Sequence, residues 1–267
     1  MKKSLRIVLI VLCVAVFLVS AFFLGRYLLV SIQTRNQFDE LAQIKDQATE
    51  PTEPSGGEEQ NFSEPVQAED PEVEEPPQIL PEYAQLYEMN NDMVGWITIE
   101  NTVIDYPVMQ RRAEKDYYLY RDFYGEDNIH GCIYVREQCD VFAPSDNVVI
   151  YGHRMKDGSM FRQLLEYEDR SFYEEHSTIT FNTLYETHTY QIIAVFKTTM
   201  DYKGFAFHHF DDAQDEAQFD EYVAKCMELA LYDTGETAVY GDKLITLATC
   251  EYSAYAGRMV IVAKRVS

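Results

Sequence analysis

Nineteen consecutive residues near the N-terminus, Ile7–Gly25, carry no charge. At 1.5 Å per residue, a helix over this stretch is about 28 Å long, which matches the hydrocarbon core of a bilayer. Three cations and no acidic residue precede it, and cations flanking a span tend to stay in the cytoplasm. We therefore expect a cytoplasmic N-terminus (residues 1–6), a single-pass membrane anchor (residues 7–30) and an extracellular remainder.

A cleaved signal peptide is the alternative interpretation of this stretch. Val19–Ala21, with the sequence VSA, is a weak cleavage site. The apolar region of a signal peptide is usually about 7–15 residues long, shorter than the stretch in this chain. The length therefore favours an uncleaved anchor.

The segment that follows is acidic and rich in proline. Residues 36–82 hold fourteen acidic residues and one lysine, and seven of the nine prolines lie between Pro51 and Pro81. Such a composition buries too little apolar surface to offset the entropy lost on ordering. We expect a disordered, extended tether over residues 31–82, which would hold the following domain away from the membrane.

The overall charge narrows the range of partners. The chain of 267 residues has a net charge of −23, and residues 83–267 contribute −15. An acidic body repels phosphate backbones, so the composition argues against a nucleic-acid partner. The five cysteines are odd in number and do not indicate a disulfide framework. For Cys132 and Cys139, a disulfide and two free thiols both remain open.

Residues 83–267 have the pattern of one globular domain that is mainly β. Short runs rich in Val, Ile, Thr and Tyr alternate with turn residues, which indicates strands. At least seven such strands with few helices favour a closed or nearly closed barrel. Helical periodicity occurs at Leu80–Asn90 and over the longer stretch Asp211–Asp233.

A thiol and a guanidinium stand at the ends of the last two predicted strands. Cys250 ends the run LITLATC, and Arg258 opens RMVIVAKRV. If these strands pair, the short loop between them brings the two groups close together. A fixed cation there would stabilise a thiolate, or the oxyanion that forms when a thiolate attacks a carbonyl.

A cysteine nucleophile needs a partner that transfers protons. His153 follows the apolar run NVVIY, so it too stands at a strand end. The other five histidines occupy positions typical of surface or packing residues: His130, His176, His188, His208 and His209. No glycine-rich phosphate loop and no zinc-type spacing of Cys and His is present, so we expect neither a cofactor nor a metal.

These residues resemble the sortases, cysteine transpeptidases of Gram-positive cell surfaces. The resemblance rests on TLATC at Thr246–Cys250, the arginine eight residues later, and the upstream strand that ends in YGH. Three further stretches are similar to class B: DMVGWITIENTVIDYPVMQ (92–110), YYLYRDFYGE (117–126) and YGHRMKDGSMF (151–161). The resemblance implies a closed eight-stranded barrel with an N-terminal helix and a long helix between strands 6 and 7.

The resemblance also implies roles for the site. Cys250 would attack a Thr carbonyl in the C-terminal sorting signal of a secreted protein and form a thioacyl intermediate. His153 would protonate the leaving amine, and Arg258 would hold the substrate backbone and the oxyanion. An amine of peptidoglycan would then resolve the intermediate. Tyr151 and Thr249 are expected to line the pocket, with the backbone amide of Glu251 as a second oxyanion donor.

One departure and three alternatives remain at this stage. Class B members often have serine two residues before the cysteine, where this chain has Ala248, so the signal preference is not fixed. A pilin-polymerising sortase is the nearest variant. A cysteine endopeptidase that uses the same three residues is a second class, and a non-enzymatic adhesin on a stalk is a third.

Overall fold

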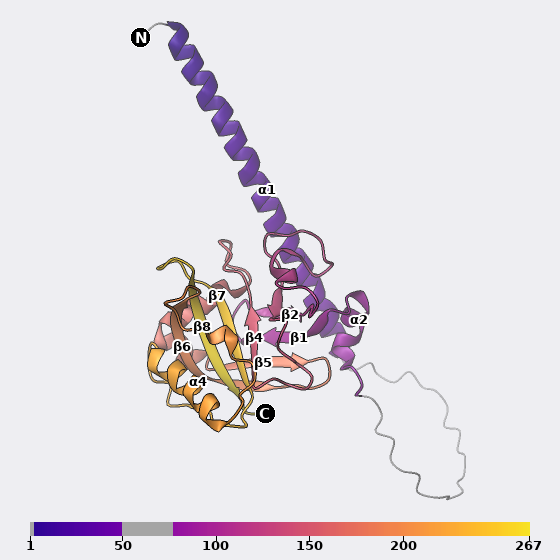
Figure 1. Cartoon of the computed structure of the whole chain (residues 1–267). Coiled ribbons are helices and arrows are strands. Elements are labelled where there is room, and N and C mark those ends of the chain that lie inside the picture. The colour runs from indigo at the N-terminus through magenta and orange to yellow at the C-terminus, as the bar shows by residue number, and fades with distance from the viewer. Residues whose placement is uncertain (1–2, 50–76) are drawn as a thin grey trace, which may run out of the picture.

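The computed structural model describes residues 3–49 and 77–267. Eight strands form a closed barrel in the order β1-β2-β3-β4-β7-β8-β6-β5 (Figure 1). The strands are β1 (Met93–Thr98), β2 (Asp105–Met109), β3 (Ile133–Val135), β4 (Asn147–Tyr151), β5 (Thr178–Thr183), β6 (Thr189–Thr199), β7 (Leu244–Cys250) and β8 (Gly257–Arg265). The helices are α1 (Lys3–Thr49), α2 (Pro81–Met89), α3 (Arg170–Glu175) and α4 (Glu216–Leu229), with 3₁₀ turns η1 (Tyr117–Tyr120), η2 (Phe161–Glu168) and η3 (Phe207–His209).

The barrel confirms the mainly β fold that the strand pattern predicted and the eight strands that the resemblance implied. Strand β7 is buried along nearly its whole length, which is why it reads as a continuous apolar run rather than an alternating one. Gly95 lets β1 approach β5, because a Cβ at this position would overlap the carbonyl oxygen of Asn182. Each strand of the closed sheet therefore has a partner on both sides.

Two predicted helices are also confirmed. Helix α2 is the N-terminal helix of the domain, and Tyr83 and Leu86 are its buried residues. Helix α4 lies between β6 and β7; it begins after Asp215, whose side chain accepts a hydrogen bond from the amide of Gln218. Cys226 is buried on the inner face of α4, as expected for a packing residue.

Cys132 and Cys139 are two separate free thiols, both buried. Burial raises the pKa of Cys139 to about 11 and raises that of Cys132 as well. The Cys139 thiol contacts the β4 backbone, where its Sγ accepts from the amide of Val149. Both residues are neutral packing groups, and the alternative of a disulfide does not hold.

Helix α1 corrects the predicted start of the tether. The helix is long and apolar enough to cross a membrane, but it continues to Thr49, and its C-terminal half packs on the barrel domain (Figure 1). Its buried residues recur every three or four positions, at Ser31, Thr34, Phe38 and Leu41. The three acidic residues of this half, Asp39, Glu40 and Asp46, occupy its exposed face. The remainder of the predicted tether, residues 50–76, lies outside the described residues.

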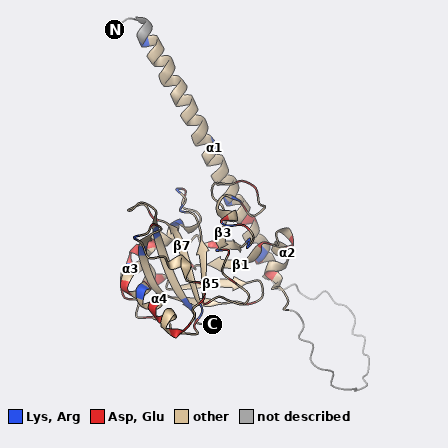
Figure 2. Cartoon of the chain, viewed as in Figure 1, with Lys and Arg blue, Asp and Glu red and all other residues tan. Residues whose placement is uncertain are grey.

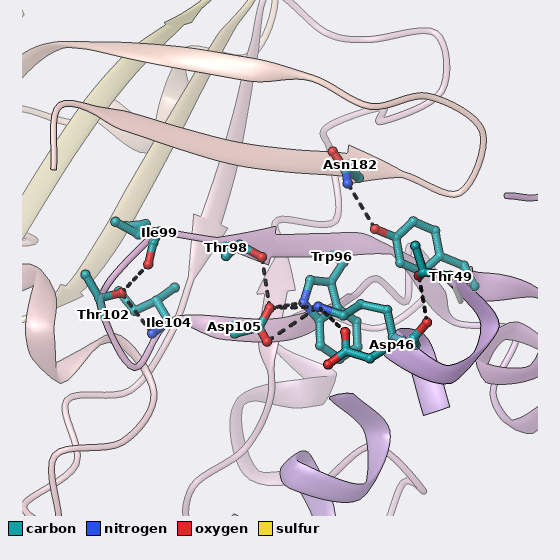
Figure 3. Close-up of polar contacts among 11 residues, drawn as sticks. Asp46, Thr49, Trp96, Thr98, Ile99, Thr102, Ile104, Asp105 and Asn182 are labelled. Carbon is teal, nitrogen blue, oxygen red and sulfur yellow. Dashed lines mark hydrogen bonds and ion pairs between the residues drawn. The ribbon is translucent and has the colours of Figure 1, made fainter. Parts of the chain in front are cut away.

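The C-terminal end of α1 is held by a polar cluster around Asp105 (Figure 3). Asp105 accepts hydrogen bonds from Trp96 Nε1 (2.6 Å) and Thr98 Oγ1 (2.9 Å). Lys45 Nζ lies 3.1 Å from the same carboxylate and 4.6 Å from the centroid of the Trp96 ring. Helix α1 is therefore a structural part of the barrel domain as well as a candidate membrane span.

Replacing Leu41 with alanine is expected to lower the free energy of unfolding by about 2–5 kcal/mol, because Leu41 is fully buried between α1 and the barrel domain. The measurement is denaturant unfolding of the full chain in detergent, followed by the fluorescence of Trp96, the single tryptophan. Gln43→Ala, on the exposed face of the same helix, is the matched control and should have little effect. Equal stabilities of the two variants would contradict the packing of α1.

Candidate active site

A cavity of about 440 Å³ lies at the end of the barrel where β4 and β7 finish and β8 begins. Cys250, His153 and Arg258 all contribute to its wall. The three residues that the sequence singled out therefore come together, although 97 positions separate the histidine from the cysteine. The strand register explains how.

Cys250 and Arg258 are direct partners in the antiparallel β7–β8 pair. Residues opposite each other in such a pair have their Cβ atoms about 4.5–5.5 Å apart and project from the same face of the sheet. The loop between them can be short because the two strands are adjacent in the barrel. A loop of six residues, 251–256, thus delivers a thiol and a guanidinium to one place.

Strand β4 runs parallel to β7 on the other side, with Tyr151 level with Ala248. The alignment continues past the strand end, because the amide of Gly152 donates to the carbonyl of Ala248 (3.2 Å) and Thr249 Oγ1 donates to the carbonyl of Gly152 (2.8 Å). His153 and Cys250 each lie two residues beyond the aligned pair. The parallel register therefore carries the histidine alongside the cysteine.

The His153 ring is oriented by the segment at η1. Its Nε2 lies 2.6 Å from the carbonyl oxygen of Leu119, and its ring packs on Tyr120 with the centroids 5.3 Å apart. A carbonyl only accepts, so this contact assigns the proton to Nε2 and leaves Nδ1 as a proton acceptor. Burial lowers the pKa of His153 below its usual 6.5, and the charge of Arg258 lowers it further. The imidazole is therefore neutral at neutral pH.

The Arg258 guanidinium is held by the backbone and keeps its charge available. Its Nη1 donates to the carbonyl of Gly257 (2.9 Å) and, at 3.5 Å, to that of Ala256. Across residues 6–49 and 77–267, no carboxylate forms an ion pair with it. An unpaired cation beside a thiol can stabilise negative charge on the sulfur or on an attacked carbonyl oxygen.

The predicted lining residues separate into two groups. Tyr151 and Thr249 line the cavity, and so does Ala248, the residue that departs from the class B pattern. Glu251 is not part of the wall: its amide donates to the carbonyl of Gly257 (2.9 Å), and its carboxylate accepts from the amide of Ser253. The Glu251 amide is already paired within the β7–β8 loop, so it does not point a free donor into the cavity as the sequence had suggested.

Sequence reasoning missed several residues of the cavity wall, among them Arg136, His208 and His209. Burial, together with the neighbouring His209 and Arg136, lowers the pKa of His208 to about 4, so its ring is neutral at neutral pH. The connection between β6 and α4 brings the two histidines to the site. No local motif marks them, because their neighbours in sequence resemble those of an ordinary packing turn.

Comparison with known proteins gives a consistent result. A sortase domain model matches residues 97–266. The chain is 34% identical to sortase B of Listeria monocytogenes over 192 residues, which covers 71% of this chain and 76% of the relative. A sortase B structure from Bacillus anthracis, in complex with AAEK1, has a TM-score of 0.70 at 29% identity and covers 90% of this chain and 99% of that one. A Staphylococcus aureus sortase B–substrate complex has a TM-score of 0.72 at 25% identity, covering 89% and 98%. With this barrel, this site and these similarities, the chain belongs to the sortase family, in its class B branch.

Proposed function

We propose that this class B sortase cleaves a C-terminal sorting signal after threonine and transfers the protein to an amine of the cell wall. Its family membership makes it a cysteine transpeptidase of the cell wall. The observation that supports the finer assignment is the meeting of Cys250, His153 and Arg258 in one cavity.

In the proposed first half-reaction, the Cys250 thiol gives its proton to His153 Nδ1, and the sulfur attacks the threonine carbonyl carbon. Arg258 stabilises the oxyanion of the tetrahedral intermediate. When the peptide C–N bond breaks, the imidazolium returns the proton to the leaving amine. A thioester between Cys250 and threonine remains.

In the second half-reaction, an acceptor amine attacks the thioester carbonyl and gives a proton to neutral His153. The C–S bond then breaks, an amide forms, and the proton on His153 returns to the sulfur. A substrate complex of the Staphylococcus aureus relative and a sortase B structure complexed with triglycine support a peptide signal and an amine acceptor for this chain.

We further propose that α1 anchors the enzyme once in the membrane, with residues 1–6 in the cytoplasm and the barrel outside. The uncharged stretch Ile7–Gly25 and the preceding cations support this topology. Tyr151 and Thr249 are proposed to contact the sorting signal, because both line the cavity. The partners are then secreted proteins that carry the signal and a peptidoglycan precursor or cross-bridge amine.

The test uses the full chain in detergent micelles with a panel of sorting-signal peptides and candidate wall amines, and mass spectrometry reads the products. We expect cleavage after threonine, a thioacyl adduct on Cys250 and a new amide with one of the amines. Cleavage without transfer to any amine would favour the cysteine endopeptidase. Transfer to a lysine of a second surface protein would identify a pilin polymerase.

A prediction on pH follows from the buried histidine. The NMR signal of the His153 ring should titrate with a midpoint below 6.5, because burial disfavours the charged imidazolium. Protonation removes the acceptor for the thiol proton, so kcat/KM should fall as the pH falls through the same midpoint. His153→Gln assigns the signal. A midpoint above 6.5 would contradict the proposed neutral base.

A further inference from the structure

The barrel domain contacts α1 just after the uncharged stretch Ile7–Gly25, and the part of the helix before that point extends away from it (Figure 1). Tyr27 comes two residues after the uncharged stretch, about 3 Å along a helix, and its ring stacks on that of His130 in the barrel domain. One turn later, Ser31 Oγ lies 3.3 Å from His130 Nε2, and Asp157 holds the same nitrogen at 2.9 Å. Contacts with the barrel domain therefore begin within two residues of the end of the uncharged stretch Ile7–Gly25.

The outer face of α1 remains apolar over these same turns. Leu28, Leu29 and Ile32 are each more than half exposed, whereas Ser31 is buried against the barrel domain. One side of this segment suits lipid while the other contacts protein. The barrel is therefore apposed to the bilayer surface. Residues 50–76 connect α1 to α2, and both helices pack on the barrel domain, so the length of that segment does not set the distance from barrel to membrane.

A basic and aromatic surface faces the same end of the molecule. Tyr27 lines a depression together with Arg154, Lys156, Arg162 and Tyr252. The Arg154 guanidinium lies 4.5 Å from the centroid of the Tyr252 ring. We call Arg154, Lys156, Arg162, Tyr252 and Tyr255 the loop surface. Arg162 lies in η2, and the other four residues lie in the β4–η2 and β7–β8 loops. In Figure 1 these two loops project to the side from which the N-terminal half of α1 extends.

The charges of the loop surface suit an anionic partner. Arg162 is paired with Glu166 (3.2 Å), and the nearby Asp157 is paired with His130. Arg154 and Lys156 form no ion pair within the described parts of the chain. Both belong to a domain that is strongly acidic overall. Figure 2 shows acidic residues of this domain on α3 and α4, away from the two loops. Tyrosine and lysine or arginine are the residues enriched where proteins meet lipid headgroups.

We propose that the loop surface binds the anionic phospholipid headgroups of the bilayer in which α1 is anchored. The inference rests on the proposed membrane anchoring. Tyr252 and Tyr255, 69% and 89% exposed, insert at the interface, and Arg154 and Lys156 contact phosphate groups. Both loops adjoin the active site, since the β4–η2 loop contains His153 and the β7–β8 loop follows Cys250 and precedes the strand that carries Arg258. The cavity mouth therefore lies at the lipid surface, where it receives sorting signals that are still held in the same membrane.

The test places a fluorescent reporter on this surface. The full chain carrying Tyr255→Trp is reconstituted into vesicles of phosphatidylcholine with phosphatidylglycerol, using brominated lipids that quench tryptophan on contact. We expect strong quenching of the new tryptophan. Tyr240→Trp is the matched control, because this partly exposed tyrosine precedes the opposite end of β7 from Cys250, and it should stay unquenched. Trp96 is buried and common to both variants.

Charge reversal then tests the electrostatic contribution. Arg154→Glu combined with Lys156→Glu should remove most of the quenching at position 255, whereas Lys225→Glu on α4 should leave it unchanged. Equal quenching at positions 255 and 240, or quenching insensitive to the double reversal, would overturn the proposal. Binding of the loop surface to a soluble anionic wall polymer, without quenching by the brominated lipids, would overturn the proposal as well.

Turnover of a soluble signal peptide by each variant in detergent separates this inference from the proposed function. Normal peptide turnover without lipid quenching would reject lipid binding by the loop surface and leave the proposed function unaffected. Absence of peptide cleavage by the unmodified chain would reject the proposed function, whatever the lipid result.

Discussion

Cys250→Ala is expected to reduce transpeptidation by on the order of 10⁴-fold or more, since removing a nucleophile leaves only the binding and oxyanion contributions to catalysis. The thioacyl adduct should disappear from the intact-mass spectrum at the same time. The fold should persist, because Cys250 is partly exposed at a strand end and its loss opens no core cavity. Peptide turnover and the unfolding midpoint are the two measurements.

The control for this substitution is another exposed thiol. Cys13→Ala, on the surface of α1 in the predicted span, removes a cysteine without touching the cavity and should leave turnover unchanged. Cys250→Ala that retained full surface function would instead support the adhesin alternative. If a signal peptide were still cleaved at the normal rate, Cys250 would not be the nucleophile.

His153→Gln is expected to lower kcat/KM by about 10²–10⁴, the usual contribution of a positioned general acid and base. Glutamine can still donate to the Leu119 carbonyl through its amide, so the local structure should survive. It cannot carry a proton between the thiol and the leaving amine. Single-turnover measurements should show slower acylation of Cys250, because its proton then has no protein acceptor.

His188→Gln provides the comparison for the histidine substitution. His188 lies just before β6 and pairs with Glu186, at a distance from the cavity wall. Its loss should change kcat/KM little. A similar loss in both variants would mean that His153 acts through folding rather than through proton transfer.

The candidate catalytic residues could be proposed from local sequence because each ends or begins an apolar run. A strand end is a local property, set by the apolar residues before it and the turn residues after it. The sequence could not show that Tyr151 aligns with Ala248, which is the register that carries His153 to Cys250. Arg136 and His208 were missed for the same reason, since only the closed barrel brings them to the cavity.

The prediction from composition was wrong for the C-terminal part of α1. Residues 31–49 were predicted to be part of a tether because acidic residues dominate the region as a whole. Phe38 and Leu41 lie at helical spacing and pack against α2 and β2. This packing stabilises the helix despite the acidic composition of the region. Helix stability in proteins comes mostly from such tertiary packing.

The sequence by itself determined the apolar span, the mainly β domain and the thiol, imidazole and guanidinium that the chemistry needs. These depend on residue type and short-range pattern. Only the tertiary structure decided the tautomer of His153, the pairing of the Glu251 amide and the packing of α1 on the barrel domain. Each of these depends on contacts between residues far apart in the chain, whose register and packing are set when the barrel closes and α1 docks against its domain.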